Sequence, residues 1–186
     1  MVTMVLNVLV VPDATVATEL STLLSRKLSS AGYQAIREPP GLDRGDGNRP
    51  DGMTLHAWKE GKELVWDVTV VDTLAPSHVR VTAAEAGAAA LKAEREKSEK
   101  YGELAERYNF CPIGMETMGS WGQEARKIIG EIGKKLILNT SEIRAAAFLK
   151  QKISLEIQRG NAISVLGTAP LSPGLNEVYF LLNWKH

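Results

Sequence analysis

The sequence predicts an α/β fold in which helices flank one central mixed sheet. Two observations predict it. Segments with helical periodicity alternate along the chain with short runs rich in β-branched and aromatic residues. The 186 residues, 44% of them hydrophobic, are also enough to bury one core. We therefore expect one domain over 13–168, between an N-terminal segment of unassigned structure, 1–12, and a C-terminal tail, 169–186.

In the first part of this domain, the sequence predicts one helix and three strands. Asp13 can cap a helix whose leucines recur at helical spacing until Ala31 and Gly32 end it. A strand over 33–37 then leads into a loop rich in Gly and Pro. Two further runs of Thr, Val, Leu and Trp flank a short turn and predict a hairpin, with strands at 52–58 and 63–71.

In the second part of the domain, the sequence predicts three helices and one strand. A long helix rich in Ala, Glu and Lys is expected over 81–108, in spite of the glycines inside it. The apolar run after it predicts a buried strand over 109–118. The last two helices are expected over 123–137 and from a cap at Thr140 or Ser141 to about Arg159.

Composition excludes several classes of protein. Lys and Arg together number 22, as do Asp and Glu, so nucleic-acid binding would require a local basic patch. The single Cys111 can form neither an internal disulfide nor a thiolate zinc site, which favours an intracellular location, nuclear or cytoplasmic. The apolar run from Met4 to Val11 is too short to cross a bilayer, so we expect no membrane association.

The predicted hairpin carries one acid on each strand. Facing positions about the turn place Asp51 opposite residues 67–69, so that Asp51 and Asp67 can meet. A carboxylate inside an apolar strand is costly to bury unless something compensates its charge. Two adjacent carboxylates can hold Mg²⁺ or Mn²⁺, which prefer oxygen ligands. Alternatively, Asp51 begins a strand and each acid forms a salt bridge.

Basic side chains supply further candidates. Lys97 and Lys100, with Tyr101, project from one side of the long helix and reach the acids if that helix packs across the sheet. A cation there would stabilise the charge that develops on a phosphate. As an alternative, these lysines are solvated and pair with nearby glutamates. Three arginines near the Gly-rich loop are candidate phosphate contacts or solvated turn residues: Arg37, Arg44 and Arg49.

Three elements of the sequence carry a family resemblance: Pro50-Asp51, Trp66-Asp67-Val68-Thr69 and Lys97-x-x-Lys100-Tyr101. In this order and spacing they resemble the restriction-like endonuclease domain that follows the reverse transcriptase in early-branching non-LTR retrotransposons. That domain is a branch of the PD-(D/E)xK nuclease superfamily. The resemblance covers about residues 15–168 and implies a restriction-endonuclease-like fold.

The resemblance also implies a role for each matching residue. Asp51 and Asp67 are implied metal ligands and Lys97 the catalytic lysine, with Lys100 and Tyr101 supporting it or contacting phosphate. Thr69 departs from the superfamily pattern, which usually has lysine there, so the lysine would lie on the following helix instead.

The implied activity is Mg²⁺-dependent or Mn²⁺-dependent nicking of DNA. The nick would supply the 3′ hydroxyl that primes reverse transcription, and the reverse transcriptase domain of a parent polyprotein would be a partner. The alternative is a catalytically inactive module of the same fold that binds nucleic acid or protein.

Overall fold

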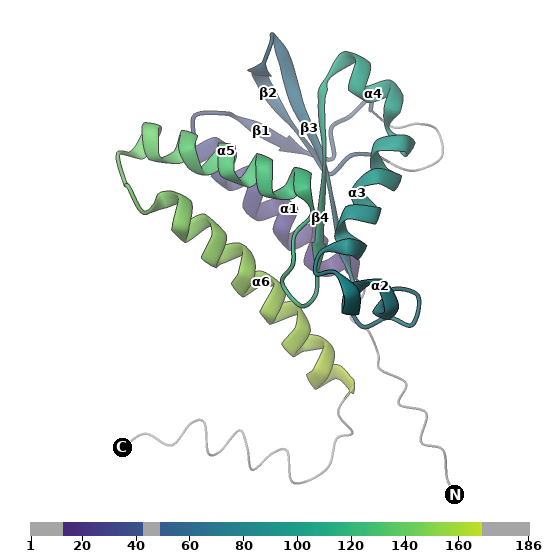
Figure 1. Ribbon diagram of the computed structural model, residues 1–186. Coiled ribbons are helices and arrows are strands. Elements are labelled where there is room, and N and C mark those ends of the chain that lie inside the picture. The colour runs from purple at the N-terminus through teal and green to yellow at the C-terminus, as the bar shows by residue number, and fades with distance from the viewer. Residues whose placement is uncertain (1–12, 43–48, 169–186) are drawn as a thin grey trace, which may run out of the picture.

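One mixed sheet with helices on both faces organises the chain (Figure 1). The computed structural model describes residues 13–42 and 49–168. Within them the sheet has the order β1-β2-β3-β4, and only the β3–β4 pair is parallel. The strands are β1 (Ala35–Arg37), β2 (Gly52–Lys59), β3 (Lys62–Val71) and β4 (Asn109–Glu116). The predicted α/β class and central mixed sheet are confirmed.

The predicted hairpin is formed by β2 and β3. Its turn residues Glu60 and Gly61 both have positive φ, 50° and 73°, which suits the right-handed twist of a two-residue hairpin. Gly52 pairs with Trp66 across the strands. A Cβ atom at Gly52 would lie only 2.1 Å from the Trp66 ring, so glycine is required where the indole crosses β2.

The prediction of one long helix over 81–108 is wrong. The chain forms three helices there: α2 (Val79–Ala84), α3 (Ala88–Lys100) and α4 (Gly102–Arg107). Gly87 precedes α3 with φ 91°, a conformation that a helix interior does not allow. Tyr101 leaves helical geometry before Gly102. Together these helices form the crossover that a parallel β3–β4 pair requires.

The remaining helices differ from expectation mainly at their ends. α1 (Asp13–Ser30) lies at its predicted position. α5 (Gln123–Thr140) is longer than predicted and ends at Ser141, whose φ is 56°. α6 (Ala145–Thr168) starts later than the expected cap at Thr140 or Ser141 and continues past Arg159.

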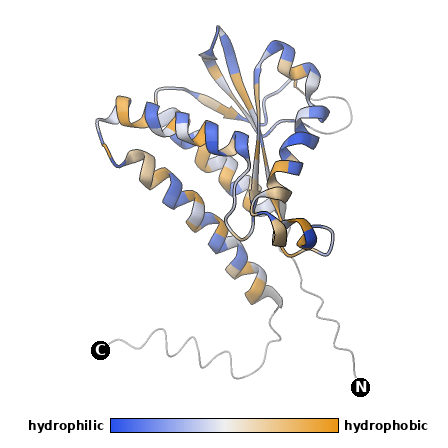
Figure 2. Cartoon of the chain, viewed as in Figure 1, coloured by the Kyte–Doolittle hydropathy of each residue, from blue (hydrophilic) through white to orange (hydrophobic). Residues whose placement is uncertain are grey.

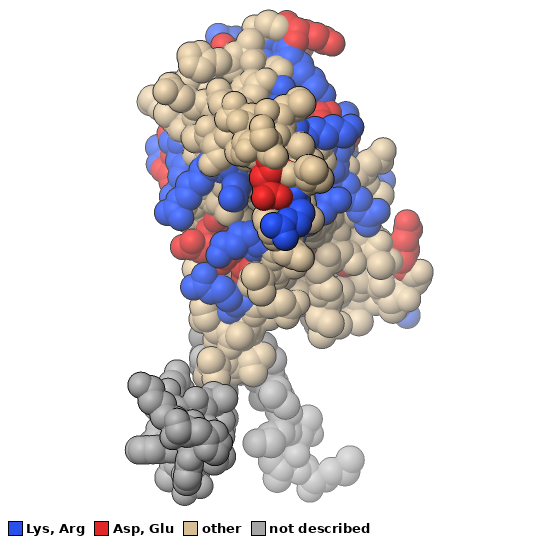
Figure 3. Space-filling model, turned by 90° about the vertical axis from the view of Figure 1, so that its left-hand side faces the viewer, with Lys and Arg blue, Asp and Glu red and all other residues tan. Residues whose placement is uncertain are grey.

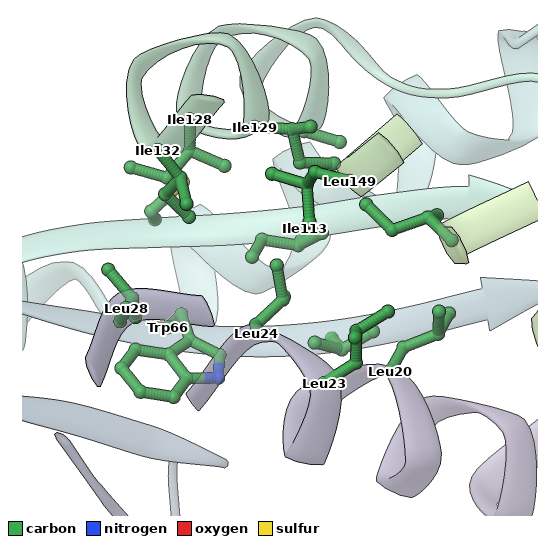
Figure 4. Close-up of a cluster of buried hydrophobic side chains, with 14 of the residues drawn as sticks. Leu20, Leu23, Leu24, Leu28, Trp66, Ile113, Ile128, Ile129, Ile132 and Leu149 are labelled. Atoms are coloured by element: carbon green, nitrogen blue, oxygen red, sulfur yellow. The ribbon is translucent and has the colours of Figure 1, made fainter. Parts of the chain in front are cut away.

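Strand alternation gives β3 two different faces. Trp66, Val68 and Val70 lie in the main core with residues of α1, α5 and α6. Figure 4 shows leucines of α1 and isoleucines of α5 converging on Trp66 and Ile113. On the other face, Val71 packs against Ala89 and Ala93 of α3. The second face is the one that carries Asp67.

The surface is mixed in character. Hydrophobic and hydrophilic residues alternate along α5 and α6 (Figure 2), as expected for helices packed on one side. On the face seen from the left of Figure 1, many Lys and Arg side chains are interspersed with acids (Figure 3). None of the described helices has the length and apolar character needed to span a membrane.

Candidate active site

Asp67 is the centre of the candidate site. Its position in β3 points it toward α3, and its side chain is only 5% exposed. The ammonium Nζ of Lys97 lies 2.5 Å from Oδ2 of Asp67. The Tyr101 hydroxyl, one helical turn after Lys97, lies 3.4 Å from Oδ1. The structure therefore brings together an acid, a lysine and a tyrosine from two different elements.

Asp51 lies beside this group, directly before β2. Its backbone oxygen accepts a hydrogen bond from the Glu38 N–H, and its Oδ2 accepts one from the Val68 N–H at 2.6 Å. The Gly52–Trp66 pair places it next to Asp67 across the hairpin. The expectation that Asp51 and Asp67 can meet is confirmed.

The environment of Asp51 favours its protonated form. Burial raises the pKa of Asp51 to about 6, and the neighbouring Asp67 carboxylate adds to the increase. The Val68 N–H, Lys97 and Arg37 act in the opposite direction and moderate it. Two carboxylates are thus held together in a partly buried place, with Lys97 and Arg37 near enough to offset part of their charge.

Lys100 lies beside Tyr101 in the last turn of α3. Its ammonium is 5.4 Å from the centre of the Tyr101 ring, and that of Lys97 is 5.9 Å from the same centre. Tyr101 is almost fully buried, and its ring packs against that of Phe110, with 4.9 Å between the ring centres. Lys100 therefore borders the site through Tyr101 and faces the neighbouring pocket.

The predicted arginines are dispersed. Arg37 ends β1, is exposed, and is close enough to Asp51 to lower its pKa. Arg49 is exposed and forms an ion pair with Glu38. Arg44 lies outside the described residues. Of the predicted arginines that the structure describes, Arg37 is thus the one near Asp51.

A comparison with known proteins adds no assignment. No protein-family model and no curated protein matches the sequence. The function must therefore be argued from the site itself.

The helix that carries Lys97 is attached to its neighbours by a buried carboxylate that the sequence does not single out. Glu94, one turn earlier in α3, is 3% exposed. Its carboxylate accepts hydrogen bonds from the N–H groups of Gly114, Glu124 and Ala125 at 3.3, 3.0 and 2.9 Å. A Cβ atom at Gly122 would lie 2.2 Å from this carboxyl group. Glu94 thus attaches α3 to β4 and to the first turn of α5.

A second carboxylate fixes the start of the same helix. Glu116, at the end of β4, is 1% exposed and accepts hydrogen bonds from the N–H groups of Ala89 and Ala90 at 3.0 and 3.3 Å. These N–H groups belong to the first turn of α3, which has no partner within the helix for them. Glu94 and Glu116 together hold α3 against the sheet, and so hold Lys97 against Asp67.

The carboxylates present suit a magnesium-type ion. Oδ2 of Asp67 is buried and paired with the Lys97 ammonium, and the buried Oγ1 of Thr69 on the same strand face has no hydrogen-bond partner. In residues 13–42 and 49–168, no three His, Cys, Asp or Glu side chains gather as a metal cluster. Mg²⁺ is commonly held by one or two carboxylates with water and substrate phosphate. Asp51 and Asp67 meet that requirement, whereas a site for Ca²⁺ or Zn²⁺ would require more ligands.

Proposed function

We propose that this protein is a metal-dependent DNA endonuclease-like domain with a restriction-endonuclease-like fold, related to the nucleases of non-LTR retrotransposons. One observation carries the proposal. Lys97, from a helix, and Asp51 and Asp67, from a hairpin, lie together in one partly buried place. Carboxylates and a lysine at one point are the groups needed for metal-assisted hydrolysis of a phosphodiester.

In this proposal Asp51 and Asp67 hold the metal ion. When bound, Mg²⁺ or Mn²⁺ supplies a Lewis acid that polarises a phosphoryl oxygen and makes water more acidic. The raised pKa of Asp51 means that proton and metal compete for the same carboxylate. Asp67 keeps its position because the Tyr101 hydroxyl is next to its other oxygen.

Lys97 has two roles in the proposal. Without metal its ammonium neutralises Asp67, whose side chain would otherwise be a buried, unpaired charge. Its own side chain is 28% exposed, so the ammonium lies at the boundary between the buried acids and solvent. From there it can contact a phosphate at the acids and stabilise the negative charge that develops during hydrolysis.

The biological setting follows from the same proposal. Hydrolysis that leaves a 3′ hydroxyl on one DNA strand creates a primer for a reverse transcriptase. The proposed partners are therefore DNA and the reverse transcriptase domain of a parent polyprotein. The proposed location is wherever that DNA is, in the nucleus or the cytoplasm.

A second candidate is an inactive module that binds nucleic acid or protein. It is favoured by the ion pair itself, because Lys97 already compensates Asp67 without any metal. In such a module Asp67, Lys97 and Tyr101 would serve only to stabilise the packing of α3 on the sheet.

A plasmid assay separates the two candidates. Supercoiled DNA is incubated with Mg²⁺ or Mn²⁺ and wild-type protein, Asp67→Asn or Lys97→Met. Lys92→Met is the matched control, because Lys92 lies on the same helix in an exposed pair with Glu96. The endonuclease proposal expects nicking by wild type and Lys92→Met, and a loss of at least about 100-fold in the other two variants.

Two further measurements complete the test. DNA ligase should reseal the nicks if they carry a 3′ hydroxyl and a 5′ phosphate. Mn²⁺ should raise the melting temperature of wild type but not of Asp67→Asn, because an ion that binds only the folded state stabilises it. Equal nicking by wild type and Asp67→Asn, or no effect of Mn²⁺ on wild type, would favour the inactive module.

A further inference from the structure

A pocket of about 600 Å³ lies beside the candidate active site. Tyr101 belongs to both, since its hydroxyl is 3.4 Å from Oδ1 of Asp67 and the residue is part of the pocket lining. The other walls come from the end of α3, from α4 and from residues 41–42. The pocket and the candidate active site therefore share Tyr101 as a common boundary.

The pocket lining combines three kinds of side chain. Lys100 and Arg107 supply positive charge, Glu103 and Glu106 supply carboxylates, and Leu104 supplies an apolar, half-buried surface. The Arg107 guanidinium lies 5.7 Å from the Tyr108 ring centre, within the range of a cation–π contact. For a ligand that is only an anion, the two carboxylates offset the attraction of the two cations, so the lining favours a ligand that also carries hydrogen-bond donors and an apolar face.

A nucleotide has the complementary set of groups. Its phosphate would pair with Lys100 and Arg107, and an exocyclic amino group of its base can donate to a carboxylate. The face of the base can pack on Leu104. The volume lies within the range of small-molecule sites, about 300 to 1,000 Å³. A base inside a duplex cannot enter such a pocket without leaving the stack.

We propose that this pocket binds one nucleotide of an unpaired strand, adjacent to the phosphodiester that the acids cleave. The adjacency rests on the proposed function, whereas the binding itself rests on the pocket. The site would direct the domain to DNA that is frayed, flipped or already single-stranded near the cut. The same chemistry fits DNA or RNA, which the experiment distinguishes.

The test measures binding of a labelled single strand of about ten nucleotides by fluorescence anisotropy in EDTA. The variants are Arg107→Ala and Arg107→Lys, with Arg95→Ala as the control, because Arg95 is an exposed arginine of α3 outside the pocket. We expect Arg107→Ala to weaken binding at least fivefold, and the other two to remain within twofold of wild type. Loss of one phosphate contact should also reduce the slope of log affinity against log salt by about 0.7.

Comparison of ligands completes the experiment. If single-stranded DNA binds more tightly than RNA of the same sequence, the pocket is assigned to the target DNA strand. If RNA binds more tightly, the pocket is assigned to an RNA template. Equal affinity of wild type and Arg107→Ala, or equal affinity for single strand and blunt duplex, overturns the proposal. If Arg107→Ala weakens binding while wild-type protein never nicks plasmid, the proposed function fails and the pocket stands. If plasmid is nicked but Arg107→Ala binds normally, only the pocket proposal fails.

Discussion

Lys97 and Asp67 are joined across the interface between α3 and β3, with 2.5 Å between Nζ and Oδ2. The positions of the two elements are set independently of this ion pair, since β3 is a central strand of the sheet and α3 is part of the crossover to β4. The ion pair is therefore formed by the tertiary fold and not by local sequence. Its energetics can be measured apart from any activity.

Removal of the lysine should leave a buried charge without a partner. We expect Lys97→Met to lower the free energy of unfolding at pH 7.5 by about 1 to 3 kcal/mol, less than for a fully buried pair because solvent screens the partly exposed lysine. Lys92→Met, which breaks an exposed pair with Glu96, should cost less than about 0.5 kcal/mol. Urea unfolding measures both. Adding Asp67→Asn to Lys97→Met should recover most of the loss, and equal costs for the two lysine variants would contradict the role assigned to Lys97.

Asp51 should make stability depend on pH in a defined window. Its pKa is raised from 3.8 to about 6 in the folded protein, so between these values the folded state binds more protons than the unfolded state. The contribution of Asp51 is complete below about pH 4 and is lost as the pH rises through about 6. We expect Asp51→Asn to be more stable than wild type at pH 7.5 and to show a smaller decline from pH 4 to pH 6.5.

Thermal unfolding in EDTA at several pH values is the appropriate measurement, because EDTA removes any contribution from bound metal. Asparagine can still accept the hydrogen bond from the Val68 N–H through its side-chain oxygen. If Asp51→Asn were as unstable as Asp51→Ala, or had the same pH profile as wild type, burial of the charge would not be the main cause of the raised pKa of Asp51.

Glu94 should affect both stability and the position of Lys97. Glutamine at 94 offers one carbonyl oxygen where the carboxylate accepts three backbone N–H bonds, so we expect a loss of about 1 to 3 kcal/mol. Glu96→Gln is the control, since Glu96 is exposed on the same helix. If Glu94 positions Lys97, a double-mutant cycle on Lys97 and Asp67 should give a smaller coupling energy in the Glu94→Gln background. An unchanged coupling energy would limit Glu94 to a purely structural role.

Much of the fold is predictable because its signals are local. The Glu60-Gly61 turn and the β-branched runs beside it define the hairpin, and the leucines of α1 define a helix. The division of the expected long helix is not predictable from propensity. An alanine-rich sequence favours a continuous helix, and the deciding factor is Gly87, which adopts positive φ where the chain turns onto the sheet.

In the candidate site, too, some residues are predictable from local sequence and others are not. Hairpin geometry alone brings Asp51 toward Asp67, whereas the contact of Lys97 with Asp67 is expected only on the condition that the helix crosses the sheet. Glu94 belongs to the Ala-, Glu- and Lys-rich stretch for which the sequence predicts a helix, and nothing in that stretch indicates that this carboxylate is buried. Its three N–H partners lie in β4 and α5, far along the chain, and no pattern within α3 reveals them.

Thr69 provides a further test of the packing on the face of β3 that carries Asp67. Its Oγ1 is buried without a hydrogen-bond partner on the face of β3 that carries Asp67. Thr54, by contrast, is fully buried with its hydroxyl donating to the His56 carbonyl and accepting from the Leu64 N–H, at 2.8 and 3.0 Å. Removal of an unsatisfied hydroxyl costs little, whereas removal of a satisfied one leaves its partners unpaired. We therefore expect Thr69→Val to be neutral or stabilising by up to about 1 kcal/mol, and Thr54→Val to be destabilising by about 1 to 3 kcal/mol, both by urea unfolding in EDTA. A loss of more than about 1 kcal/mol in Thr69→Val would mean that its hydroxyl has a partner, such as a water molecule held at the two acids.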